Sequence, residues 1–225
     1  MYGFTATVPT IIEGLGYTAA NAQLLTIPIY VAAMLMTLIF AFWSEHVKQR
    51  SPFIMAGNAI ACVGFIGQLA IPHHKWPGLA YGFLFPIAMG LYCPFIQIVS
   101  WTGESCTTYG EGCANRKKGN NLAPSSKRAV GMAFLISVGN FGGICGSNIF
   151  LASEKPRYPA GFGTGLGIAV AAIIMAYILR VNCRRENERR RKMIEEEGEA
   201  AIRARYGEEQ LLEMGDRSPF FVYTL

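Results

Sequence analysis

Residues 24–43 read LLTIPIYVAAMLMTLIFAFW, a run of twenty residues that contains no charged side chain. A helix rises about 1.5 Å per residue, so this run is about 30 Å long, which is the thickness of the hydrocarbon core of a bilayer. Four further apolar runs of similar length follow, at about 53–71, 77–100, 129–152 and 159–180, and they carry no charge apart from Arg180 at the end of the last. The sequence therefore predicts an all-α membrane protein with five complete transmembrane helices.

The N-terminal residues 1–12 are also apolar and uncharged, but twelve residues are too few to cross a bilayer. We expect them to be the end of a truncated first helix. Residues 1–181 are then one transmembrane half-domain. Residues 182–225 form a charged tail, expected to be solvated and partly helical, with a last stretch that is extended or disordered.

Charge is unevenly distributed, although the chain as a whole carries +5. Lys and Arg are concentrated in 44–51, in 102–128 and directly after 179, and they are sparse in the alternate loops. Basic residues beside apolar spans usually mark the cytoplasmic side of a membrane. We therefore expect these loops and the tail to lie on the cytoplasmic side. We expect the protein to reside in the plasma membrane. We expect no nucleic-acid partner.

The sequence contains no pattern that indicates catalysis. It lacks a Ser/His/acid set and paired carboxylates within the spans, and its six cysteines show no metal-ligand spacing. We expect no enzyme activity, no metal and no cofactor. The expected partners are the lipid bilayer and a small-molecule substrate.

Polar side chains inside the apolar spans are the candidates for a substrate-facing site near mid-membrane. Tyr92 and Gln97 flank Pro94, which perturbs its helix, and Asn140 lies beside glycines that let backbones separate. The predicted substrate-binding residues are Tyr30, Tyr92, Gln97 and Asn140. The alternative for each is a bond that holds two helices together.

Small residues predict where helices approach closely in lipid. The run 129–152 contains overlapping G-x-x-x-G pairs, and the run 159–180 opens with GFGTGLG from Gly161. We expect close helix contacts at these glycines, which are Gly139, Gly142, Gly143, Gly146, Gly161, Gly163, Gly165 and Gly167.

Several blocks resemble fungal major facilitator permeases of the anion:cation symporter family, the relatives of allantoate permease and nicotinic acid transporters. They are FTATVPTIIEGLGYTAANAQLLTIPIYVAA, NNLAPSSKRAVGMAFLISVGNFGGICGSNIF, EKPRYPAGFGTGLG and the closing YGEEQLLEMGDRSPFFVYTL. The resemblance implies the C-terminal half of a twelve-helix fold. It also implies alternating-access import of a small organic anion, such as a carboxylate vitamin or a ureide, with a proton as the coupled ion.

Two features depart from that family. The first six helices are absent, so a complete transporter would need the missing N-terminal half as a partner. Residues Gly103–Gly119, GESCTTYGEGCANRKKG, interrupt a short loop and are either a retained intron or a genuine cytoplasmic loop. A truncated, non-transporting membrane fragment from an incomplete gene model is therefore the alternative to a transporter.

Overall fold

A computed structural model describes the chain over residues 2–47, 49–71, 76–103, 125–150, 158–198, 201–202, 204–206, 211 and 218–223. Within these residues the structure consists of six α-helices and contains no strand. They are α1 Tyr2–Gly14, α2 Ala19–Val47, α3 Ser51–Ala70, α4 Pro77–Gly103, α5 Ser125–Ile149 and α6 Pro159–Glu197. Apart from Gly103, the segment Gly103–Gly119 lies outside the described residues.

Four of these helices are long and apolar enough to cross a membrane, namely α2, α3, α4 up to Trp101, and α6. They coincide with four of the five predicted spans. The fifth predicted span, 129–152, falls on α5, whose described apolar part is the shorter Ala129–Ile144. A membrane crossing by α5 therefore stays a prediction, and so does the total number of spans.

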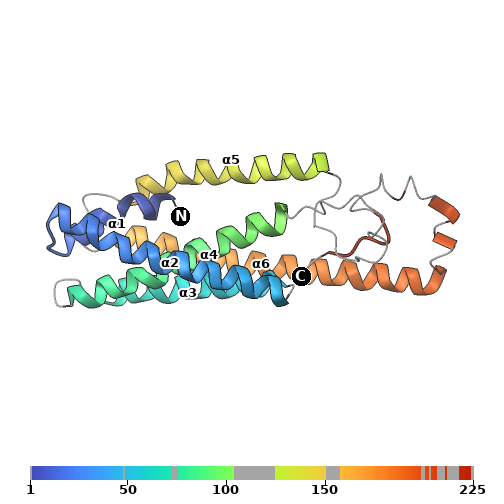
Figure 1. Cartoon of the computed structure of the whole chain (residues 1–225), viewed down its shortest axis with the longest axis horizontal. Helices are drawn as coiled ribbons and strands as arrows, with labels where there is room; N and C mark the ends of the chain where they lie inside the picture. Colours follow the sequence, from blue (N-terminus) through green and yellow to red (C-terminus); the bar gives the residue numbers. More distant parts are fainter. Residues whose placement is uncertain are drawn as a thin grey trace.

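The helices run back and forth along one elongated bundle (Figure 1). The connection from α2 to α3, the end of α4, the start of α5 and the long extension of α6 all lie at the same end of this bundle. These are the segments whose basic residues predict a cytoplasmic location. The alternation of the helices is therefore consistent with a single orientation in the membrane.

The bundle has one main apolar core, to which α1, α2, α3, α4 and α6 contribute buried side chains such as Ile12, Ile29 and Phe162. Many large apolar side chains point outward, and Phe42 on α2 is 72% exposed. In water this surface would be very unfavourable, but in a bilayer it contacts lipid tails or other transmembrane helices. The outward apolar surface therefore agrees with a membrane location.

The closest helix contact joins α3 to α4, and glycines make it possible. A Cβ atom added at Gly90 would lie 2.6 Å from the Gly57 carbonyl oxygen and would also overlap the Ala61 backbone nitrogen. A Cβ atom added at Gly64 would lie 2.8 Å from the Ile87 backbone nitrogen. The two backbones therefore touch, which maximises dispersion contact where apolar burial offers no net gain in lipid.

The glycines that the sequence predicts to make close helix contacts do so only in part. Gly139 and Gly142 on α5 have open space around them, whereas an added Cβ atom at Gly146 would lie 3.3 Å from the Gly3 Cα atom. On α6, Gly161 packs against the Phe150 ring, whereas Gly163 has no neighbour. The prediction was therefore wrong for part of this set, because spacing along one helix does not say which face meets a neighbour.

Helix α6 runs without a break from Pro159 to Glu197, through the expected boundary between the membrane half-domain and the tail. The boundary at 181/182 stays a prediction. Residues 218–223, part of the C-terminal stretch expected to be extended or disordered, form no helix or strand and lie against α6. Hydrogen bonds from α6 side chains hold this stretch in place.

Candidate substrate-facing site

Two of the predicted site residues meet in the interior of the bundle. Tyr30 on α2 and Tyr92 on α4 form an edge-to-face ring pair with their centroids 6.1 Å apart. Thr5 on α1 joins them: its Oγ1 lies 2.8 Å from the Tyr92 Oη, and its carbonyl accepts a hydrogen bond of 3.3 Å from the Tyr30 hydroxyl. The three residues are called the tyrosine cluster below.

The bond to the Thr5 carbonyl has a local cause in the sequence. Pro9 lies inside α1, and proline has no N–H to donate to the carbonyl four residues earlier. That carbonyl belongs to Thr5, so it is left without its helical donor. The Tyr30 hydroxyl supplies the missing hydrogen bond from a neighbouring helix, which ties α2 to α1 at this point.

The tyrosine cluster is polar but carries no fixed charge. Each phenol carries one O–H donor, and Tyr30 and Tyr92 are both half-buried, so the cluster is partly accessible. The Tyr92–Thr5 pair can exchange donor and acceptor roles. Hydroxyl donors bind a carboxylate by charge-assisted hydrogen bonds, which are stronger than bonds between neutral groups.

Gln97 lies elsewhere, about 7.5 Å further along α4 than Tyr92 by helix rise. Its side-chain oxygen accepts a hydrogen bond of 2.9 Å from Ser44 on α2, and the two residues are 2% and 1% exposed. This arrangement is the one expected of a bond that holds two helices together. A role of Gln97 in binding a substrate stays a prediction. The described contacts of Gln97 do not include the tyrosine cluster.

Asn140 is also separate from the tyrosine cluster. It is exposed on α5, and its neighbour Gly139 has open space around it. The exposed side chains of α5 on either side of it include Phe134 and Phe141, each 70% exposed. The described structure thus brings two of the four predicted residues together, and it adds Thr5, which the sequence reasoning missed.

The Ser44–Gln97 bond leads to a stability prediction. Gln97→Leu keeps the approximate size of the side chain but removes the acceptor on α4, which leaves the buried Ser44 hydroxyl only its longer bond of 3.4 Å to the Ala41 carbonyl on its own helix. We expect the free energy of unfolding to fall by about 1 kcal/mol, which is typical of an interhelical hydrogen bond in a membrane protein. Thermal unfolding of the purified chain in detergent measures this loss. The matched control is Gln23→Leu on the exposed surface of the same helix pair, and equal midpoints for the two variants would contradict the prediction.

The amino-acid sequence of this chain is similar to those of several fungal transporters. The chain is 33% identical over 227 residues to the MFS-type transporter cnsO of Penicillium expansum, covering 100% of this chain and 40% of that protein. It is 28% identical over 222 residues to the high-affinity nicotinic acid transporter of Saccharomyces cerevisiae, covering 99% of this chain and 37% of that protein. The chain is thus similar, along almost its whole length, to fungal transporters of the major facilitator type, and it has four helices long and apolar enough to cross a membrane.

A third relative is the major facilitator-type transporter hxnP of Emericella nidulans, at 25% identity over 219 residues. That match covers 96% of this chain and 40% of the relative, so the chain spans about two fifths of the length of these curated relatives. No family model and no solved structure matches the chain. The relatives carry transporter names, which agrees with the expectation that the chain is not an enzyme.

Proposed function

We propose that this chain is part of a permease of the anion:cation symporter family that moves a small organic anion across the membrane by alternating access. The substrate class is a carboxylate vitamin, a ureide or a similar compound. The observation that carries the proposal is the similarity to a nicotinic acid transporter over 99% of this chain. The two other relatives described above also carry transporter names, over 100% and 96% of the chain.

The tyrosine cluster supports an anionic substrate on chemical grounds. The Tyr92 and Thr5 hydroxyls, which can exchange donor and acceptor roles, can offer a hydrogen-bond donor to a carboxylate, and they remain neutral when the site is empty, so no unpaired charge is held in the membrane. The cluster joins α1, α2 and α4, so a substrate bound there would contact three helices at once. Movement of these helices against a second, N-terminal six-helix half would then open the site to each side in turn.

The remaining parts of the proposal concern coupling and location. We propose that a proton accompanies the anion, that the protein resides in the plasma membrane, and that its C-terminal tail is cytoplasmic. The last point is supported by the end of α4, the start of α5 and the extension of α6, which lie at one end of the bundle (Figure 1) and adjoin basic stretches of the sequence. The non-transporting fragment is less favoured, because transporters match the chain along almost its whole length.

Uptake by a permease-deficient host tests the proposal. Long-read sequencing of the transcript first defines the coding sequence to express. Cells that express the product should accumulate radiolabelled nicotinate faster than vector controls, and an excess of unlabelled small carboxylates or of allantoate should reduce the rate. A correctly inserted product that leaves uptake of every tested anion at the vector level would overturn the proposal.

A further inference from the structure

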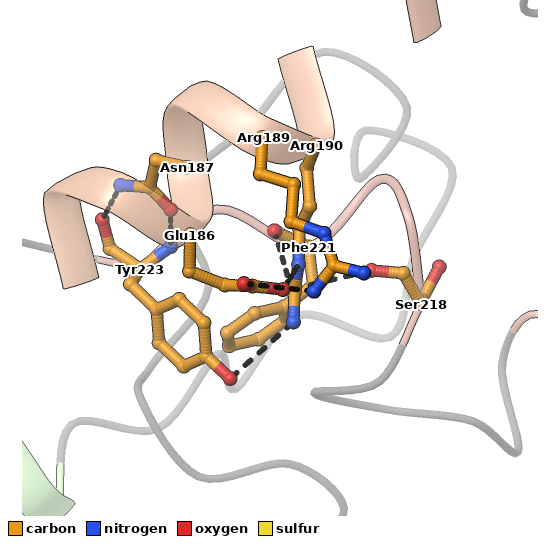
Figure 2. Close-up of polar contacts among 7 residues, drawn as sticks. All are labelled: Glu186, Asn187, Arg189, Arg190, Ser218, Phe221 and Tyr223. Carbon is orange, nitrogen blue, oxygen red and sulfur yellow. Dashed lines mark hydrogen bonds and ion pairs between the residues drawn. The ribbon is translucent and has the colours of Figure 1, made fainter. Parts of the chain in front are cut away.

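The end of the chain returns to the helix from which it departs. Helix α6 continues to Glu197, and residues Ser218–Tyr223 lie against its segment 186–190, as Figure 2 shows. Residues 218–223 are called the strap below. The strap meets α6 beyond the apolar run 159–180, so this contact lies outside the part of α6 expected in the membrane.

One side chain of α6 recognises the strap through its backbone. The Asn187 amide donates to the Tyr223 carbonyl at 2.9 Å, and the Tyr223 N–H donates to the Asn187 Oδ1 at 2.9 Å. This two-point contact satisfies both backbone groups of one residue, as a neighbouring strand would. It sets the register of the strap on α6, because a shift of one residue would lose both bonds.

A second side chain, Arg190, holds the strap at several points. Its guanidinium donates to the Phe221 carbonyl at 2.9 Å and to the Ser218 carbonyl at 3.3 Å, and it lies 4.9 Å from the centre of the Tyr223 ring. Its Nε atom bonds to Glu186 on the same helix at 3.0 Å. The planar guanidinium group of arginine can donate hydrogen bonds to all these acceptors at once, whereas the compact ammonium group of lysine cannot.

The burial of Arg190 distinguishes it from other basic residues along this segment. Its side chain is only 12% exposed, whereas Arg184 and Arg191, which also form ion pairs one turn along α6, are 72% and 76% exposed. An arginine so well covered requires partners for its charge and its N–H groups. The strap carbonyls and Glu186 provide them (Figure 2).

We propose that the strap is a detachable, self-docking element, and that the face of α6 formed by Glu186, Asn187 and Arg190 is its docking surface. When docked, the strap keeps its apolar residues partly covered against α6. When released, it exposes the apolar sequence PFFVY.

The contacts explain why release does not require the bundle to unfold. The charge partner of Arg190 is Glu186 on the same helix, so the pair stays together and becomes hydrated when the strap leaves. The other acceptors are backbone carbonyls, which water can satisfy. Elements held by few contacts of this kind open locally, well below the free energy of global unfolding.

Hydrogen–deuterium exchange of the full chain in detergent micelles tests the proposal. The amides of 221 and 223 in the wild-type strap should exchange more slowly than in an unstructured peptide, but faster than amides in 159–180 of α6. Arg190→Ala and Asn187→Ala should each raise the strap exchange rate about tenfold or more, because each removes bonds on which docking depends. Arg190→Lys should also raise it, since lysine lacks the planar fork.

The matched control is Arg184→Ala, which removes an exposed arginine with an ion pair to Glu188 and no contact to the strap. It should leave strap exchange unchanged. Slow exchange in 159–180 in every variant shows that the bundle is folded. Three results would overturn the proposal: wild-type strap amides that exchange like a free peptide, an Arg190→Ala rate equal to that of Arg184→Ala, or strap amides that exchange only together with 159–180.

Discussion

Gly90→Ala is expected to lower the free energy of unfolding by about 3 kcal/mol, the upper end of the range for an overpacked site. The added methyl group would lie 2.6 Å from the Gly57 carbonyl oxygen and would overlap the backbone of Ala61. Because both neighbours are backbone, no side chain can rotate to relieve the overlap, and α3 and α4 must separate. For a chain of this size such a loss lowers the unfolding midpoint by roughly 6–12 °C.

The control for this prediction is Gly82→Ala, on the same helix. An added Cβ atom at Gly82 meets no neighbour within 4 Å, so this variant should keep the wild-type midpoint or exceed it slightly because alanine favours helix. Thermal unfolding of both purified variants in the same detergent measures the difference. Equal midpoints for Gly90→Ala and Gly82→Ala would show that α3 and α4 do not touch as described.

Tyr92→Phe is expected to slow anion uptake about tenfold or more while the protein remains folded. The substitution removes one hydroxyl, which bonds to the Thr5 Oγ1 at 2.8 Å, and keeps the ring that packs on Tyr30. A hydrogen bond to a charged group is worth about 1.5 kcal/mol or more, which corresponds to a tenfold change in rate or affinity. Initial rates of radiolabelled nicotinate uptake in the permease-deficient host measure the effect.

Tyr177→Phe provides the matched control for the loss of a phenol hydroxyl. Tyr177 lies on α6 and is 56% exposed on the outer surface of the bundle. Its variant should transport at the wild-type rate at equal surface expression. A Tyr92→Phe variant that also transports at the wild-type rate would remove the tyrosine cluster from the proposed substrate pathway.

The sequence alone predicts the transmembrane architecture well, because the thickness of a bilayer sets the length of an apolar helix. Four predicted spans are confirmed as helices that are long and apolar enough to cross. The pairing of Tyr30 with Tyr92 was not predictable, since residues far apart in sequence meet only through the packing of α2 against α4. Thr5 did have a signal, because Pro9 has no N–H to donate to its carbonyl.

Helix contacts and the strap show where sequence patterns give too little information. The G-x-x-x-G spacing on α5 drew attention to Gly139 and Gly142, which have open space, whereas Gly57 and Gly90 make the close contact. The tail reads as solvated because it is rich in charge. However, Asn187 and Arg190 are three residues apart and so lie on one face of α6, where together they bind the strap.

The most direct test of the central claim, that this chain is part of an organic-anion transporter, is nicotinate uptake in liposomes by the purified product of the sequenced transcript. Preparations with a cooperative thermal unfolding transition are reconstituted, and the initial rate is compared with that of protein-free liposomes from the same lipid. We predict saturable uptake above the protein-free rate, reduced by unlabelled small carboxylates. A folded, reconstituted protein with an uptake rate equal to that of protein-free liposomes, for nicotinate and for other small organic anions, would contradict the claim.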